Sequence, residues 1–167
     1  MAVLEILQYP DPRLRTKAAR VTEVTDAIRR QVEDMYETMY HAQGVGLAAT
    51  QVDIHLQLFT IDVSETRDQR MCFVNPEIVS QEGVQYEAEG CLSVAGAYDR
   101  VERAAKVRLR GTDLDGKVIE LEAEGLMATC FQHEMDHLNG ILFIDHLSRL
   151  KQDRYQKKLV KLIKNRE

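Results

Sequence analysis

The stretch LMATCFQHEMDHL, residues 126–138, constrains the fold most, because it is apolar on more than one helical face. At the spacing of an α-helix, one side collects Met127, Phe131, Met135 and Leu138, and another collects Leu126, Thr129, Cys130, His133 and His137. A helix that is apolar on several sides belongs in a protein core, and Asn139-Gly140 is typical of a helix end. We therefore expect a buried central helix that the other elements surround.

Two further helices are predicted, one on each side of this central helix in the sequence. From Thr25 an apolar stripe with helical spacing predicts a helix that stops at Gly44, and its members are Ile28, Val32, Met35 and Met39. The end of the chain predicts an amphipathic helix with Leu150, Tyr155, Leu159 and Leu162. Near the start, Asp11-Pro12 is typical of the cap and first position of a short helix.

Four segments between the helices are predicted to be strands. LQLFTIDV (56–63) and MCFVNPEIV (71–79) are rich in β-branched and aromatic residues. KVRLR (106–110) and KVIELEAE (117–124) flank GTDLDG, which indicates a hairpin. The expected fold is α+β, with a mostly antiparallel β-sheet wrapped around the central HExxH-bearing helix, an N-terminal helix and a C-terminal amphipathic helix.

The length of 167 residues favours one domain, which can bury roughly 70% of its unfolded surface. No linker divides the chain, so we expect residues 1–147 to form the main part and 148–167 a basic helix of the same domain. The N-terminus lacks a secretory pattern, and no apolar run is long enough for a membrane span. Cys72, Cys91 and Cys130 have no paired spacing, which favours a cytoplasmic protein with free thiols.

The charge of the chain is unevenly distributed. Residues 148–167 hold eight Lys or Arg and two acidic residues, whereas the preceding body holds 14 basic and 25 acidic residues. The tail therefore carries +6 on a body of −11. Such a helix is either an ordinary solvated face or a docking surface for a polyanion.

The spacing of two histidines in QHEMDH points to a metal site. His133 and His137 lie one helical turn apart, so both imidazoles can reach one ion. Three protein ligands plus a water are usual for a catalytic metal, and Glu134 can serve that water as a general base. Two unpaired imidazoles and a carboxylate on a buried helix would otherwise be costly.

The third ligand is not given by the helix itself. The position of a third histidine in the metzincin pattern is occupied by Phe143, and the one glutamate after Glu134 is the terminal Glu167. The candidates that remain are Asp145, His146 and Cys130 nearby, and Cys91 upstream in YEAEGCLSV.

Three segments resemble the signature motifs of the bacterial peptide deformylase family. They are GVGLAATQ (44–51), EGCLS (89–93) and QHEMDH (132–137), in the order and approximate spacing of that family. The flanks YPDPRLR, VNPEI and LNGILFIDHLS are similar as well, so the likeness covers nearly the whole chain. The resemblance implies that residues 1–147 are catalytic, and that the enzyme removes the N-terminal formyl group from formyl-methionine of nascent polypeptides, releasing formate.

The resemblance also implies the catalytic groups. Cys91, His133 and His137 would bind one divalent metal ion, usually Fe²⁺, with Zn²⁺, Ni²⁺ or Co²⁺ able to substitute. Glu134 would serve both proton transfers around attack by metal-bound hydroxide. The side-chain amide of Gln51 and the backbone N–H of Leu92 would stabilise the developing oxyanion.

A peptide-binding surface is implied by the same motifs. Gly46 and Gly90 would pair with an extended peptide backbone, and an apolar pocket for methionine would be formed by Val45, Leu126, Thr129 and Cys130. Glu89 would pair with Arg103 and order the loop of Cys91. The sequence departs from the family at Ala95, where proline is common, and at Glu87, near an often apolar pocket position.

Several partners and alternatives follow. The basic helix 148–167 would dock on the ribosome, as in related bacterial enzymes, and we expect a monomer that binds no membrane. GVGLAATQ lacks the Lys and Ser or Thr of a phosphate-binding loop, so no nucleotide cofactor is expected. Two other functions stay open: a metallo-endopeptidase with Asp145 as third ligand, and a non-catalytic ribosome-associated relative.

Overall fold

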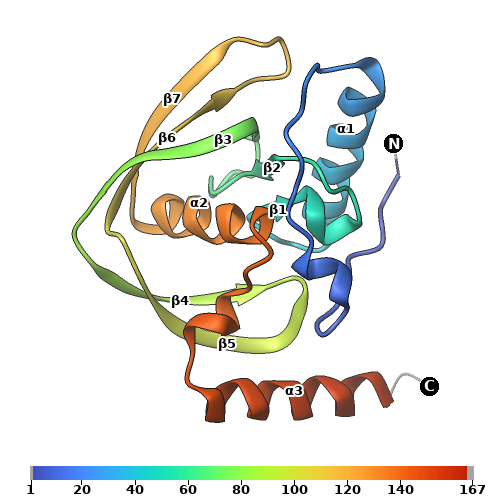
Figure 1. The fold of residues 1–167 in the computed structure, drawn as a ribbon, viewed down its shortest axis with the longest axis vertical. Coiled ribbons are helices and arrows are strands. Elements are labelled where there is room, and N and C mark those ends of the chain that lie inside the picture. Colours follow the sequence, from blue (N-terminus) through green and yellow to red (C-terminus); the bar gives the residue numbers. More distant parts are fainter. Residues whose placement is uncertain (1, 165–167) are drawn as a thin grey trace.

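The computed structural model describes residues 2–164, which fold around one central helix (Figure 1). This helix, α2 (Gly125–Leu138), runs between a five-stranded sheet and a two-stranded sheet. The expected α+β fold with antiparallel sheets around the HExxH helix is therefore confirmed. Residues 165–167 of the predicted basic helix lie outside the described residues.

Both sheets consist of antiparallel pairs. The larger has the order β1 (Gly46–Ala48), β2 (Leu58–Ile61), β3 (Met71–Glu82), β6 (Lys106–Thr112) and β7 (Val118–Glu124). The smaller is a hairpin of β4 (Gln85–Cys91) and β5 (Val94–Arg103). β1 and β4 are thus edge strands of different sheets.

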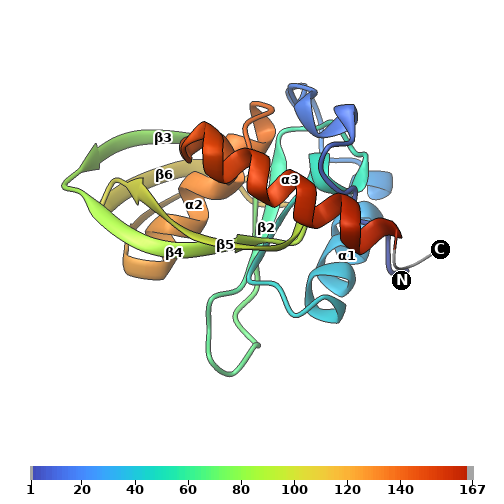
Figure 2. The same ribbon diagram turned by 90° about the horizontal axis from the view of Figure 1, so that it is seen from below.

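The remaining elements are helical. They are α1 (Asp26–His41), α3 (Arg149–Lys164) and the short 3₁₀ helices η1 (Pro12–Arg15), η2 (Ala49–Val52) and η3 (Phe143–His146). Figure 2 shows α3 crossing the outer face of the β4–β5 hairpin. Within residues 2–164 no helix is both long and apolar enough to cross a membrane.

Three phenylalanines fix α2 on the five-stranded sheet. Phe59 of β2, Phe73 of β3 and Phe131 of α2 are fully buried. The ring centroid of Phe131 lies 5.3 Å from that of Phe73 and 6.2 Å from that of Phe59. This cluster sets the height of α2 over the sheet, and therefore the position of its histidines.

The predicted helices and strands are found with adjusted ends. The hydroxyl oxygen of Thr25 accepts a hydrogen bond from the backbone N–H of Ile28 and caps α1. The helix ends at His41, before the predicted Gly44, because Gln43 adopts φ +59° and turns the chain. Val32, Met35 and Met39 are fully buried, as the stripe predicts.

Two expectations differ from the structure. β1, β4 and β5 have no counterpart among the predicted strands, since their glycines and charged residues weaken any strand pattern. In α3, Tyr155 and Leu159 are buried, but Leu150 and Leu162 of the predicted stripe are exposed. Only one narrow face of α3 packs, because its support is a two-stranded hairpin.

We predict that Phe131→Ala lowers the free energy of unfolding by about 3–5 kcal/mol, because it leaves a cavity in a packed cluster. Urea denaturation measures this change. The matched control is Leu150→Ala, at a side chain that is 81% exposed, which should cost less than about 0.5 kcal/mol. Equal costs for the two variants would contradict the role of the phenylalanine cluster.

Candidate active site

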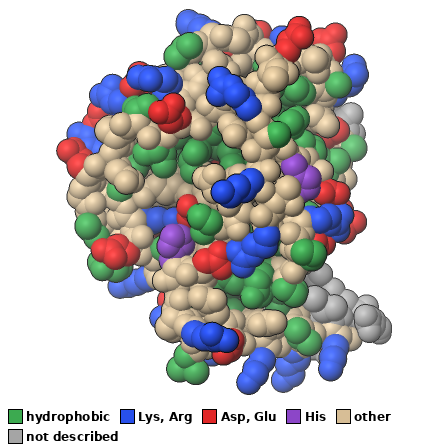
Figure 3. All heavy atoms as spheres, viewed as in Figure 1, with side chains coloured by type: hydrophobic (Ala, Val, Ile, Leu, Met, Phe, Trp, Pro, Cys, Tyr) green, Lys and Arg blue, Asp and Glu red, His purple; other side chains and the backbone are tan. Residues whose placement is uncertain are grey.

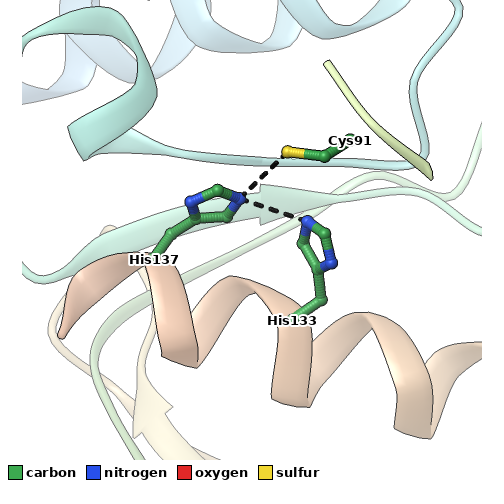
Figure 4. A group of neighbouring side chains, drawn as sticks. All are labelled: Cys91, His133 and His137. Carbon is green, nitrogen blue, oxygen red and sulfur yellow. Dashed lines mark hydrogen bonds between the residues drawn. The ribbon is translucent and has the colours of Figure 1, made fainter. Parts of the chain in front are cut away.

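Cys91, His133 and His137 converge at one point between the two sheets (Figure 4). Their possible ligand atoms all lie within 4.8 Å of one another. His137 Nε2 is 3.1 Å from His133 Nε2 and 3.3 Å from Cys91 Sγ. The histidines come from successive turns of α2, whereas Cys91 ends β4. The β4–β5 hairpin and α2 therefore have to be in place together for this cluster to form.

This donor set fits a metal ion. One thiol and two imidazoles are ligands for Zn²⁺, Fe²⁺, Ni²⁺ and Co²⁺ alike, and three protein ligands leave a position open for water or substrate. His133 and His137 are buried and direct Nε2 atoms at each other, an arrangement that a shared cation stabilises. Cys91, His133 and His137 thus have the donor set and the spacing to hold a metal ion.

The other proposed third ligands are engaged elsewhere. Asp145 Oδ1 accepts a hydrogen bond from Arg15 at 3.0 Å, and Asp145 Oδ2 accepts one from the Leu142 backbone N–H. His146 Nε2 lies 2.9 Å from Asp136 Oδ2. Among the described residues the group of converging ligand atoms contains neither Asp145 nor His146, so the structure does not support an endopeptidase with Asp145 as ligand. Cys130 is buried in the wall of a cleft and does not belong to the cluster.

A buried ion pair orients the first histidine. Glu89 Oε1 lies 2.9 Å from His133 Nδ1, and both Glu89 oxygens accept hydrogen bonds from Arg103 at 2.8 and 2.9 Å. Arg103 also donates to Asp136 at 2.6 Å. A proton on Nδ1, held by the carboxylate, leaves Nε2 of His133 free to bind a metal. Sequence reasoning missed Asp136 and His146 in this network.

Glu134 lies beside the cluster of Cys91, His133 and His137, and its side chain is shielded from solvent. Its side chain is buried, and burial raises the pKa of this carboxyl to about 7. Oε1 has no hydrogen-bond partner among the described residues. A Cβ atom at Gly46 would come within 2.6 Å of Oε2, so a side chain at this position would displace the Glu134 carboxyl. A carboxylate with such a pKa and an open acceptor suits a general base.

Gln51 and Leu92 are held next to the cluster by short contacts. Gln51 is buried; its Oε1 accepts from the Ala48 N–H, and its Nε2 donates to Ser93 Oγ, both at 3.0 Å. The same Nε2 is 3.7 Å from Cys91 Sγ. The Leu92 carbonyl accepts from Gln8 Nε2 at 2.8 Å. The sequence carried no signal for Gln8, and it indicated Ser93 only as the last residue of the EGCLS motif.

A cleft of about 500 Å³ opens beside the metal site. It is lined by Glu89 and by the six residues expected to contact the peptide, namely Gly46, Val45, Gly90, Leu126, Thr129 and Cys130. The cleft runs between the edge strands β1 and β4, which contribute Gly46 and Gly90. Glu87 is exposed and does not line it.

We predict that Glu89→Ala weakens metal binding by about 10–100-fold, because His133 loses its orienting partner and Arg103 is left buried without its carboxylate. Competition with a chromophoric chelator measures the affinity. The control Glu33→Ala breaks the exposed pair of Glu33 with Arg70 and should leave metal affinity unchanged. Unaltered affinity in Glu89→Ala would refute the orienting role.

Comparisons with known proteins agree with this geometry. The family model for polypeptide deformylase matches residues 3–153. The chain is 55% identical to the peptide deformylase of Chromobacterium violaceum and 57% identical to peptide deformylase 1 of Pseudomonas syringae, in each case over 96% of both chains. A crystal structure of a peptide deformylase from Legionella pneumophila superposes with a TM-score of 0.96 at 46% identity, covering 99% of this chain and 98% of that one. The cluster of Cys91, His133 and His137 and this likeness along the full length lead to one conclusion: the chain belongs to the peptide deformylase family.

Proposed function

We propose that the enzyme hydrolyses the formamide bond of N-formyl-methionyl peptides and nascent chains, releasing formate. The observation that carries this proposal is the metal site with Glu134 at the inner end of a cleft between two sheet edges. An open cleft admits the end of a peptide, and buried Glu134 supplies a base there. A non-catalytic relative would have no need for this base.

Substrate binding follows from the two edge strands. An extended peptide adds to the free edges of β1 and β4, because unpaired backbone groups there can accept a further strand. Gly46 and Gly90 let its backbone approach closely. The methionine side chain enters the pocket that Val45, Leu126, Thr129 and Cys130 line within the cleft.

The chemistry uses three groups of this chain around the reacting carbon. When bound, the divalent metal acts as a Lewis acid that activates water and polarises the formyl oxygen. Glu134 accepts a proton from the attacking water and passes it to the amine nitrogen as the C–N bond breaks. The Gln51 amide and the Leu92 N–H donate to the oxygen that becomes negative. Formate and a free N-terminal amine are the products.

We propose Fe²⁺ as the native metal. A thiolate ligand beside two imidazoles suits a borderline cation, and ferrous iron is the usual metal in the family that this chain resembles. Zn²⁺, Ni²⁺ and Co²⁺ accept the same ligands and are expected to substitute.

We also propose that the enzyme works in the cytoplasm as a monomer and docks on ribosomes through α3. Its three cysteines are free thiols. Figure 3 shows Lys and Arg side chains along the lower edge of the molecule, where Figure 1 places α3. The exposed cations of this helix include Lys157, Lys161 and Lys164. These charges suit ribosomal RNA. Because Tyr155 and Leu159 are buried, we assign residues 148–167 to the same domain as residues 1–147.

Replacing Glu134 by Gln tests the proposed chemistry. Glu134→Gln should lower kcat for formyl-Met-Ala-Ser by about 10²–10⁴-fold, because the proton acceptor is lost, and should leave metal content unchanged. Formate release and elemental analysis measure the two quantities. The exposed change Glu87→Gln serves as control. Full activity of Glu134→Gln, or cleavage of internal peptide bonds by the parent enzyme, would contradict the proposal.

Charge reversal on α3 tests ribosome docking. The triple variant Lys157→Glu, Lys161→Glu, Lys164→Glu should weaken binding to ribosomes and reduce the slope of log affinity against log salt by about 2. A sedimentation assay measures both. The control reverses Lys17, Arg20 and Arg30, which are exposed on another part of the chain. Equal affinity of the two triple variants would argue against docking through α3.

A further inference from the structure

One strand of the hairpin faces both the cleft and the C-terminal helix. Gly96, Ala97 and Tyr98 of β5 line the cleft. Ala97 is buried, whereas Tyr98 is 69% exposed and therefore stands at the rim. With the formyl end of a substrate at the metal site, this exposed rim offers a path along which the residues after methionine can leave the cleft.

The segment Gly96–Tyr98, which forms this rim, is hydrogen-bonded to α3 on the side of β5 that faces away from α2. Lys158 Nζ donates to the Gly96 carbonyl at 3.0 Å, and Tyr155 Oη donates to the Tyr98 carbonyl at 3.0 Å. A Cβ atom at Gly96 would lie 3.4 Å from both Lys158 Cε and Leu162 Cδ1. Figures 1 and 2 both show α3 running across β5 on the side away from α2.

Asp99 completes this attachment. Tyr155 Oη is 3.0 Å from Asp99 Oδ2, and Lys151 Nζ is 3.2 Å from Asp99 Oδ1. Tyr155 itself is buried and packs in a cluster with Val94 and Ala97. The hydroxyl of Tyr155 therefore has a fixed place, from which it contacts two consecutive residues of β5.

The hairpin depends on such outside support. An isolated two-stranded sheet is only marginally stable, so the position of β5 is set by what packs on it. Tyr98 lies opposite Gly90 in the strand register, and a Cβ atom at Gly90 would be 3.3 Å from Tyr98 Cδ2. A shift of β5 would thus reach the peptide-binding edge of β4.

We propose that Tyr155 is a positioning residue for substrate. By holding Gly96–Tyr98 it sets the affinity for the peptide residues that follow formyl-methionine, while the metal site keeps its own supports in Glu89 and Arg103. This inference rests on the proposed deformylation of peptides. It makes α3 part of the substrate-binding apparatus as well as a surface for docking.

The variant Tyr155→Phe removes the hydroxyl and keeps the ring. For formyl-Met-Ala-Ser we expect KM to rise about fivefold with kcat unchanged, which is the size of effect of one net hydrogen bond. For formyl-methionine amide, which has no residue after methionine, we expect no change in kcat/KM. The matched control Tyr86→Phe removes a hydroxyl from a 60% exposed position of the same hairpin and should behave as the parent.

Hydrogen exchange followed by mass spectrometry supplies a second readout. Amides of residues 94–99 should exchange faster in Tyr155→Phe than in Tyr86→Phe, and those of α2 should not change. If Tyr155→Phe unfolds, Lys158→Met is tested in its place. This variant removes the hydrogen bond to the Gly96 carbonyl, and the methionine side chain still covers Gly96.

Two results would overturn the proposal: unchanged KM for the tripeptide, or equal losses on the tripeptide and on the amide. A parent enzyme that releases no formate from either substrate would instead refute the proposed function. The two failures are therefore distinguishable.

Discussion

The structure depends on keeping a polar segment of α2 inside an apolar core. His133, Glu134 and His137 are all buried, and each buried polar group has to be offset by a partner. For His133 that partner is Glu89, which Arg103 neutralises with two hydrogen bonds. A cation bound by Cys91, His133 and His137 would offset the facing Nε2 atoms of both histidines. Glu134 retains an open oxygen, and this is the position from which a base can act.

This requirement explains why two sheets are needed. The five-stranded sheet supports α2 through Phe59, Phe73 and Phe131, but it supplies none of the partners of the histidines. Cys91, Glu89 and Arg103 all come from the β4–β5 hairpin. Because the two sheets are separate, each presents a free edge, and the cleft lies between those edges.

The hairpin in turn is held by segments from both ends of the chain. The Tyr9 N–H donates to the Ser93 carbonyl at 2.7 Å, and Gln8 holds the Leu92 carbonyl. The Leu7 N–H donates to the Gln51 carbonyl at 2.8 Å, so the same short segment braces both proposed oxyanion donors. On the other side α3 fastens β5 through Tyr155 and Lys158.

The sequence predicted what local patterns encode. The stripe of α1, the β6–β7 hairpin and the length of α2 follow from periodicity and turn residues, and the HExxH spacing gave two ligands. Cys91 required the family motif, because the choice among Cys91, Asp145 and His146 depends on a fold that places residue 91 beside residue 137. β4 and β5 were missed because glycines and charged residues weaken their strand pattern, and because contacts with residues far along the chain stabilise them. The same reason hid Gln8, 84 residues from its partner Leu92.

The most direct measurement is X-ray absorption spectroscopy at the metal edge of the protein reconstituted with Zn²⁺, compared with Cys91→Ala. The account predicts one sulfur at about 2.3 Å and two imidazole nitrogens at about 2.0–2.1 Å in the first shell. The sulfur should disappear in the variant. A shell of nitrogen and oxygen alone, unchanged by the substitution, would show that Cys91 is no ligand and would contradict the account.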